Sequence, residues 1–158
     1  MTRTIKLPDF ISKVIVIHLN RATDRKPHLE KLAELFANYD FEVFPAVDAR
    51  ELTEHEKGER YIRNLFDPRY PFPLSDTEIA CFFSHRTVWE VIRSEVNGAT
   101  LVLEDDVDFE TAKFSNAIAA LTEGSIKETY IRLPCKKPAT LPKTASAELR
   151  TPKEVGLG

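Results

Sequence analysis

Residues 13–19 have the sequence KVIVIHL, which is almost uniformly apolar and rich in β-branched side chains. Such a run predicts a strand that is covered on both faces, as in a parallel sheet. Apolar residues then recur at helical spacing, at Leu29, Leu32, Ala33, Leu35 and Phe36. Thr23 and Asp24 can cap this helix, and its first turn tolerates Pro27. The segment therefore predicts a strand followed by a helix, the unit from which parallel sheets are built.

The alternation of strands and helices continues along the chain. Further strands are predicted at residues 41–45, 100–103 and 129–133. Helices are predicted to begin at the capping boxes of residues 53–56 and 75–78, and Phe114, Ile118 and Leu121 mark a last helix. The helix from Ser75 carries an apolar stripe, which consists of Ile79, Phe82, Phe83, Val88, Trp89 and Ile92, and Asn97-Gly98 ends it. The pattern predicts a three-layer α/β domain with a mostly parallel sheet, whose ligands bind at the carboxyl ends of the strands.

Composition agrees with one globular domain, since 42% of the 158 residues are hydrophobic and 30% are charged. The apolar runs are far shorter than the roughly 20 residues that span a bilayer, and the N-terminus lacks a signal-peptide pattern. Cys81 and Cys135 show neither metal-binding nor disulfide-framework spacing, which favours reduced thiols in the cytoplasm. The net charge of −3 gives no general attraction to nucleic acid, so we expect no nucleic-acid partner.

The composition changes after residue 133. Residues 1–133 carry the alternating pattern, whereas residues 134–158 contain four prolines and few large apolar side chains. Six basic residues and one acidic residue lie between Arg132 and Lys153. We interpret residues 1–133 as the folded domain and residues 134–158 as an extended tail or loop. Its charge fits either a solvated segment or contact with phosphate-rich ligands or an anionic membrane surface.

The segment Glu104-Asp105-Asp106-Val107-Asp108 directly follows the predicted strand at residues 100–103. Its four carboxylates repel one another unless a cation or strong hydrogen-bond donors offset their charge. Oxygen ligands without a Cys or His among them favour a hard cation such as Mn²⁺ or Mg²⁺. The alternative is a solvated acidic turn at a helix start, where the helix dipole favours negative charge.

Polar residues also follow the first strand, and these are Asn20, Arg21, Asp24 and Arg25. They would face the same crevice as the acidic segment if the two strands are neighbours. Arginine suits phosphate because its planar guanidinium binds two oxygens at once. The glycine-rich loops of Rossmann dehydrogenases and P-loop NTPases are absent, which argues against both classes. An exposed helix start is the alternative interpretation of the two arginines.

Ser84 and His85 are adjacent on a predicted helix, so they do not face each other and make a poor nucleophile–base pair. A packed or capped histidine is the alternative, and the GxSxG motif of hydrolases is absent. An acidic pair after a strand also occurs in response-regulator-like phosphate-binding modules. There it typically follows the first strand, whereas here it lies beyond residue 100.

Four blocks of this sequence resemble glycosyltransferase family 25. They are VIVIHLNRATDRKPHLEKL, FPAVDARELT, LSDTEIACFFSHRTVWEVI and ATLVLEDDVDF, which occur in the family's order and cover about residues 15–109. The family contains bacterial lipopolysaccharide and lipooligosaccharide galactosyltransferases and is related to the collagen galactosyltransferases. The resemblance implies a GT-A-type nucleotide-sugar-binding fold, a UDP-sugar donor, commonly UDP-galactose, and inverting transfer to a sugar acceptor.

The resemblance also implies roles for single residues. Asp106 would hold Mn²⁺, or Mg²⁺, against the donor diphosphate. The implied donor-binding residues are Asn20, Arg21 and Arg25 toward the nucleotide, Asp48 toward uracil or ribose, Glu104 and Asp105 toward ribose or sugar, and Ser84 with His85 toward donor or acceptor hydroxyls. The general base stays unassigned, although Asp108 is available.

We therefore expect a metal-dependent hexosyltransferase that acts in lipopolysaccharide or cell-surface polysaccharide synthesis. Its acceptor would be a glycan or lipid-linked glycan, and the protein would be cytoplasmic, with peripheral contact at the inner face of the membrane. Family members usually continue well beyond the acidic motif, with strands and loops that complete the acceptor side. About fifty residues follow the motif here. The alternative is therefore a C-terminally short, non-catalytic domain that binds the nucleotide sugar.

Overall fold

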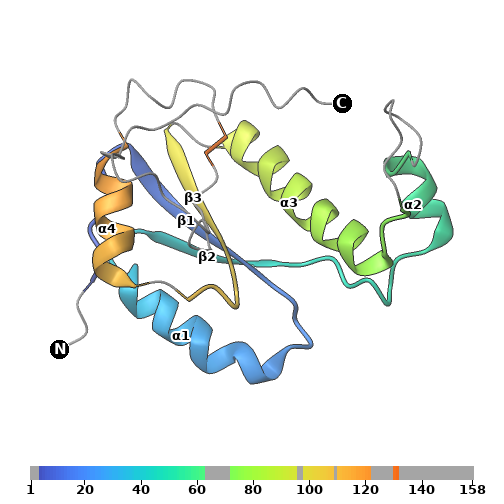
Figure 1. Ribbon diagram of the computed structural model, residues 1–158, viewed down its shortest axis with the longest axis horizontal. Helices are drawn as coiled ribbons and strands as arrows, with labels where there is room; N and C mark the ends of the chain where they lie inside the picture. The colour runs from blue at the N-terminus through green and yellow to red at the C-terminus, as the bar shows by residue number, and fades with distance from the viewer. Residues whose placement is uncertain (1–3, 63–71, 96–97, 109, 122–129, 132–158) are drawn as a thin grey trace.

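The structure is a computed structural model that describes residues 4–62, 72–95, 98–108, 110–121 and 130–131. Its elements, in chain order, are β1 (Ile11–His18), a 3₁₀ turn (Thr23–Arg25), α1 (Lys26–Leu35), β2 (Asp40–Pro45), α2 (Glu54–Arg60), α3 (Asp76–Glu95), β3 (Ala99–Glu104) and α4 (Thr111–Ala119) (Figure 1). The predicted tail at residues 134–158 and most of the predicted strand at residues 129–133 lie outside the described residues, and Tyr130 and Ile131 are not in a strand.

The three strands form one parallel sheet in the order β2-β1-β3. β1 lies in the centre, where Val14 is paired with Phe41 of β2 and with Leu101 of β3. The sheet confirms the prediction of an α/β fold with parallel strands. β1 begins two residues before the predicted run and ends one residue before the run does. β2 begins one residue earlier than predicted, and β3 is one residue longer at each end.

Helices cover both faces of the sheet, as the apolar character of β1 requires. On one face, Val14 and Val16 belong to a core that includes Leu32, Phe36 and Ile118 from the α1 and α4 segments. On the other face, Ile15 and Ile17 pack with Val88 and Ile92 of α3. Figure 1 shows α1 and α4 on one side of the strands and α3 on the other. Burying each such side chain contributes roughly 1.5–3 kcal/mol, so the three-layer arrangement is strongly favoured.

The apolar stripe predicted on α3 is only partly buried. Ile79, Phe83 and Val88 are at most 4% exposed, but Phe82 and Trp89 are 45% and 40% exposed. The prediction is wrong for these two residues. They lie seven positions apart, at the edge of the face that packs on the sheet, and the Trp89 ring lies 6.1 Å from the ring of His85.

The entry into α1 differs from the prediction. Thr23 and Asp24 do not cap the helix, because a 3₁₀ turn precedes it and Arg25 occupies the N-cap position without a side-chain cap bond. Pro27 does lie in the first turn, as expected. Because the chain enters α1 through this turn, Arg25 lies close to the carboxyl end of β1.

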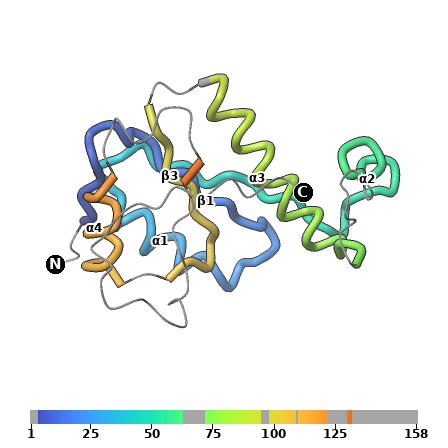
Figure 2. The backbone as a smooth tube through the Cα atoms, turned by 45° about the horizontal axis from the view of Figure 1, so that its top comes forward, coloured from blue at the N-terminus to red at the C-terminus, as the bar shows by residue number. Residues whose placement is uncertain are grey.

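Both predicted capping boxes are confirmed. Thr53 and Glu56 exchange hydrogen bonds at the start of α2, and Ser75 and Glu78 do so before α3. The backbone N–H of each cap residue holds the pKa of its glutamate below the usual value. Two views place α2 at the opposite end of the molecule from α4 (Figures 1 and 2). Within the described part of the chain, no helix is both long and apolar enough to cross a membrane.

Candidate functional site

The carboxyl ends of β1 and β3 lie side by side, as the expectation of a shared crevice required. From β1 the chain crosses to β2 on one side, and from β2 it returns past β1 to β3 on the other side. The crevice between β1 and β3 is therefore a topological switch point, where open α/β sheets bind ligands. The residues around this crevice form the candidate site.

Asp105 directly follows β3, and its side chain is buried. Its backbone N–H donates to the carbonyl oxygen of Ile17 at 3.1 Å. Its carboxylate bonds to Nδ1 of His18 at 2.7 Å and to the guanidinium of Arg25. Burial by itself raises the pKa of Asp105, but the hydrogen bonds from His18 and Arg25 outweigh it, so the pKa lies below its usual value. The ionised carboxylate lies between the His18 ring and the Arg25 guanidinium and holds both side chains in place.

Arg25 contacts both the buried Asp105 and the exposed Asp106 of the acidic segment. Its guanidinium also lies 3.4 Å from Oδ2 of Asp106. The hydrogen bond with Asp105 raises the pKa of Arg25, which stays charged. The side chains of Arg25 and Asp106 are 41% and 57% exposed, so a positive and a negative group face solvent next to each other.

Arg21 and Asp48 join the loops that follow β1 and β2. Oδ1 of Asp48 accepts the backbone N–H of Arg50 at 3.0 Å, and Oδ2 accepts Nε of Arg21 at 2.6 Å. These donors, first Arg50 and then Arg21, lower the pKa of Asp48. The ionised Asp48 thereby orients the Arg21 side chain, which lines the pocket described below. Asn20 is exposed in the same loop as Arg21.

Ser84 is buried and ties α3 to the loop after β2. Its Oγ accepts the backbone N–H of Val47 at 2.9 Å and donates to the carbonyl oxygen of Ala80 at 2.8 Å. The hydroxyl therefore acts between two backbone groups of the protein. This geometry gives the serine a positioning role for the loop that carries Asp48.

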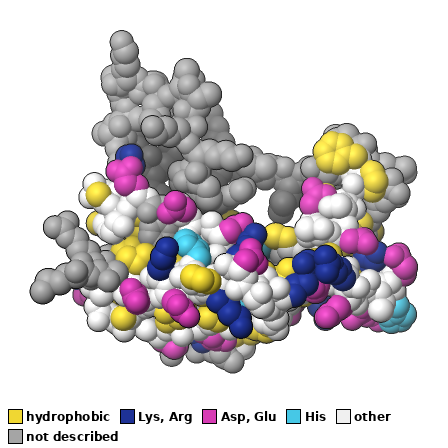
Figure 3. Space-filling model, turned by 90° about the horizontal axis from the view of Figure 1, so that it is seen from below, with side chains coloured by type: hydrophobic (Ala, Val, Ile, Leu, Met, Phe, Trp, Pro, Cys, Tyr) yellow, Lys and Arg dark blue, Asp and Glu magenta, His cyan; other side chains and the backbone are white. Residues whose placement is uncertain are grey.

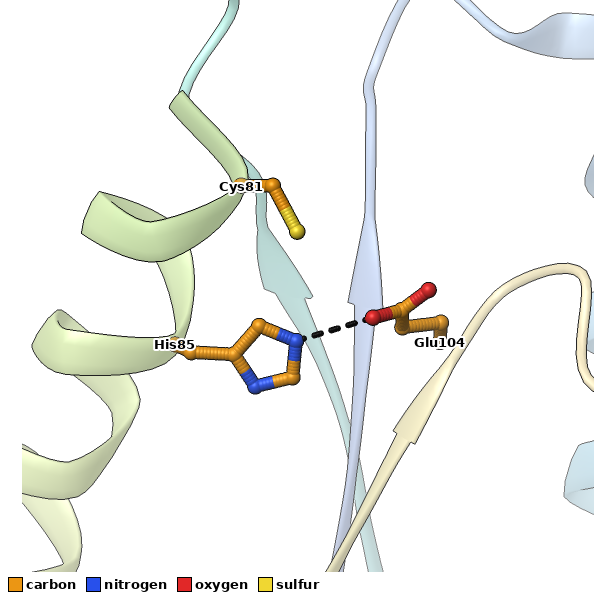
Figure 4. A group of neighbouring side chains, drawn as sticks. All are labelled: Cys81, His85 and Glu104. Atoms are coloured by element: carbon orange, nitrogen blue, oxygen red, sulfur yellow. Dashed lines mark hydrogen bonds and ion pairs between the residues drawn. The ribbon is translucent and has the colours of Figure 1, made fainter. Parts of the chain in front are cut away.

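The side chain of His85 points toward the end of β3 and does not face Ser84. Its Nε2 lies 2.9 Å from Oε1 of Glu104, and the side chains of His85 and Glu104 are 23% and 53% exposed (Figure 4). Cys81 lies one helical turn before His85, and its thiol is free. Cys81 is exposed as a residue, but partial desolvation of its thiol raises the pKa, and the charges of Glu104 and Asp106 raise it further.

A pocket of about 160 Å³ lies among these groups. This is room for roughly five water molecules. Five of the expected donor-binding residues line it, namely Arg21, Ser84, His85, Glu104 and Asp105, together with apolar side chains such as Ile17, Ala46 and Ala80. The other four expected residues, Asn20, Arg25, Asp48 and Asp106, are not among its lining residues, although Arg25 and Asp48 bond to residues that are.

Two histidines of this region were not expected from the sequence. His18 ends β1 and is 5% exposed, and His28 of α1 lies with Nε2 2.7 Å from the carbonyl oxygen of Val107. A histidine inside an apolar strand needs a buried partner, so His18 carried a usable signal. His28 carried none, because an amphipathic helix accepts a polar residue at many positions.

The charged groups do not separate into areas of one sign. Viewed from the side of the loops after β1 and β3, basic, acidic and histidine side chains are intermixed (Figure 3). Such a surface offers donors and acceptors at close range, which suits a ligand that has both an anionic part and hydroxyl groups.

Comparison with known sequences decides the family. The profile of glycosyltransferase family 25, described as an LPS biosynthesis protein family, matches residues 11–150. The chain belongs to glycosyltransferase family 25. This confirms the resemblance seen in the four sequence blocks. No solved structure gives a significant match.

Curated members of family 25 are much longer than this chain. The chain is 36% identical over 103 residues to a glycosyltransferase 25 family member of Anopheles gambiae, which covers 63% of this chain and 17% of that protein. It is 31% identical over 123 residues to a Drosophila melanogaster member, and the match covers 76% of this chain and 20% of that protein. It is 37% identical over 112 residues to human procollagen galactosyltransferase 2, and the match covers 66% of this chain and 17% of that protein. The chain thus spans about a fifth of the length of these relatives.

Proposed function

We propose that this chain is the donor-binding part of a glycosyltransferase that moves a hexose, galactose, from a UDP-sugar to a glycan acceptor with inversion. The observation that supports this most is the pairing of Arg25 with Asp105 and Asp106 across the switch point between β1 and β3. A nucleotide sugar needs cationic groups for its diphosphate and acceptors for its hydroxyl groups. The crevice offers both.

The donor set fits a hard divalent cation, Mn²⁺ or Mg²⁺, at Asp106. The Asp106 carboxylate is 57% exposed, and Glu104 adds a second exposed carboxylate. Asp105 does not fit as a ligand, because both of its oxygens are bonded to His18 and Arg25. When bound, such an ion would neutralise the charge that grows on the leaving diphosphate.

The two arginines supply the remaining positive charge. Arg21 is oriented by Asp48 and Arg25 by Asp105, so each guanidinium is held in place before a ligand arrives. Groups that are fixed in advance stabilise developing negative charge more effectively than mobile ones. Asp105 and Asp48 act here as positioning residues. His85, held by Glu104, lies in the pocket where it can bond to sugar or ribose hydroxyls.

Inverting transfer also requires a general base near the acceptor hydroxyl. Asp108 is the exposed last residue of the acidic segment and is the carboxylate we would test for this role. We infer that the acceptor is a glycan or lipid-linked glycan of lipopolysaccharide or cell-surface polysaccharide synthesis, at the cytoplasmic face of a membrane. The description of the matching family supports this acceptor class.

A second candidate is donor binding without transfer. The chain covers 17–20% of the three proteins compared, so their activity does not carry over to it directly. Under this proposal the residues around the crevice bind the nucleotide sugar and catalyse no transfer.

One set of assays distinguishes the two candidates. Calorimetric titration measures the binding of UDP-galactose with and without Mn²⁺, and a coupled assay measures UDP release with a glycan acceptor. Both candidates predict that UDP-galactose binds and that Mn²⁺ strengthens this binding. Both also predict that UDP-glucose and UDP-N-acetylglucosamine bind more weakly than UDP-galactose. Only the first candidate predicts acceptor-dependent UDP release.

The matched variants are Asp106→Ala in the site and Asp9→Ala before β1, where the residue is also exposed. We expect Asp106→Ala to abolish the effect of Mn²⁺ on donor binding and Asp9→Ala to leave it intact. Equal behaviour of the two variants would remove the metal role from Asp106. Absence of any UDP-sugar binding would refute both candidates.

A further inference from the structure

Three side chains of different chemistry converge beside the pocket. The thiol of Cys81, a ring nitrogen of His85 and a carboxylate oxygen of Glu104 all lie within 4.8 Å of one another. Figure 4 shows the cysteine and the histidine projecting from α3 toward the glutamate at the end of β3. We name these three residues the Cys-His-Glu cluster.

The fold brings the Cys-His-Glu cluster together. Cys81 and His85 are four residues apart on a helix, so they lie on the same side, one turn above the other. Glu104 is the last residue of β3, and Val102 of the same strand packs with Val88 of α3. The packing of α3 on the sheet therefore sets the distance between the helical pair and the carboxylate.

The distances suit a tetrahedral metal site. Zinc bonds of about 2.0–2.3 Å place neighbouring ligand atoms roughly 3.3–3.8 Å apart. Nε2 of His85 and Oε1 of Glu104 are now 2.9 Å apart, and no pair in the cluster exceeds 4.8 Å. Small changes in side-chain torsion alter separations of this size, so the cluster lies close to the geometry of a zinc site.

The donor set selects the metal. A thiolate and an imidazole favour Zn²⁺ and related transition metals, whereas Mn²⁺ and Mg²⁺ prefer oxygen ligands. We propose that Cys81, His85 and Glu104 form a binding site for a zinc-class divalent ion. Three protein ligands leave a fourth coordination position, and all three residues line the pocket, so that position opens toward the pocket.

This site differs from the one proposed for Mn²⁺ or Mg²⁺. It shares Glu104 with that site but depends on sulfur and nitrogen ligands of α3, and it needs no nucleotide sugar. Access is open, because Cys81 and Glu104 are exposed and His85 is partly exposed. Its test can therefore be run without donor, acceptor or activity. Failure of the zinc-class site would leave the proposed function standing, and the reverse also holds.

Cobalt spectroscopy tests the proposal. Co²⁺ is added to the reduced, metal-free protein, and the thiolate-to-cobalt charge-transfer band is recorded. We expect one equivalent of Co²⁺ to produce the band in the original protein and in Cys135→Ser, and Cys81→Ser to lack it. His85→Ala should keep a weakened band with at least about tenfold lower affinity. A band that persists in Cys81→Ser, or no band in the original protein, would overturn the site.

Thiol protection gives a second readout. Iodoacetamide is added with and without one equivalent of Zn²⁺, and mass spectrometry measures alkylation at Cys81 and Cys135 separately. The site predicts at least tenfold slower alkylation of Cys81 with Zn²⁺ and an unchanged rate at Cys135. Loss of this protection in Glu104→Gln supports the carboxylate as the third ligand. Equal slowing at both cysteines, or none at Cys81, contradicts the proposal.

Discussion

Nδ1 of His18 and Oδ2 of Asp105 lie 2.7 Å apart, with both side chains buried. This contact joins the last residue of β1 to the first residue after β3. The same carboxylate holds Arg25 with its other oxygen. One buried acid therefore fixes the end of the central strand, the start of the acidic segment and the orientation of a cationic side chain.

We predict that Asp105→Ala destabilises the protein substantially. The substitution leaves His18 without its carboxylate partner in a buried position and removes the bond that holds Arg25. An unsatisfied buried polar group costs about 1–3 kcal/mol, and we expect a loss of about 2–3 kcal/mol in the free energy of unfolding. Urea denaturation followed by circular dichroism measures it.

Asp106→Ala is the matched control for this prediction. Asp106 also pairs with Arg25, but its side chain is 57% exposed. Exposed ion pairs contribute about 0–1 kcal/mol, so the loss should be less than about 1 kcal/mol. Equal losses in the two variants would show that the buried position of Asp105 has no special weight.

The Asp105 carboxylate also predicts a dependence of stability on pH. Its pKa in the folded protein lies below its usual value of 3.8, because the bonds from His18 and Arg25 outweigh the effect of burial. A lowered pKa stabilises the fold fully above the usual pKa, and this contribution is lost as pH falls through the folded-state pKa. The stability difference between the original protein and Asp105→Asn should therefore shrink as pH falls from about 5 to about 3. A difference that stays constant over this range, in urea denaturation at each pH, would argue against the assignment.

The sheet and its layers could be predicted because β1 is apolar on both faces. Parallel sheets with helices on each side bury neighbouring residues such as Val14 and Ile15 together, and the apolar run reveals this without knowledge of distant contacts. The capping boxes could be predicted for a similar reason, since each bond spans three residues. The exposed positions of Phe82 and Trp89 could not, because the tilt of α3 on the sheet decides which apolar side chains are buried.

The site could be predicted as a set of residues but not as a set of contacts. Polar residues after β1 and acidic residues after β3 indicated a shared crevice once the strands were placed side by side. The division of the acidic segment into a buried Asp105 and an exposed Asp106 depends on His18 and Arg25, which are distant in sequence. The convergence of Cys81 with Glu104 likewise arises only from the packing of α3 against β3.

Ser84→Ala should loosen the loop after β2. The substitution removes the acceptor of the Val47 N–H and the donor to Ala80, and both bonds involve a side chain that is 2% exposed. We expect a loss of about 1–2 kcal/mol in stability, and weaker UDP-sugar binding because the loop carries Asp48. Chemical denaturation and calorimetry measure the two effects.

Ser94→Ala gives the matched comparison. Its hydroxyl also bonds to a carbonyl oxygen of α3, that of Val91, but Ser94 is exposed, and among the described residues its hydroxyl makes no hydrogen bond to a loop of the site. Stability should change by less than about 0.5 kcal/mol, and UDP-sugar binding should not change. The positioning role of Ser84 would be refuted if both serine variants bound the donor as well as the original protein does.

Gly98→Ala should destabilise the start of β3. Gly98 has a φ of +116°, and an added Cβ would lie 2.8 Å from the carbonyl oxygen of Phe10. That oxygen accepts the N–H of Ala99 at 2.9 Å, so it cannot move away without weakening the pairing of β3 with the chain before β1. Strain and the close contact together should cost about 1–3 kcal/mol.

Gly58→Ala is the control, because Gly58 lies within α2 and has no atom within 4 Å of an added Cβ. Alanine is favoured over glycine in helices by about 0.5–1 kcal/mol, so Gly58→Ala should leave stability unchanged or raise it slightly. Urea denaturation of both variants provides the test, and a Gly98→Ala protein as stable as Gly58→Ala would contradict the geometry at the start of β3.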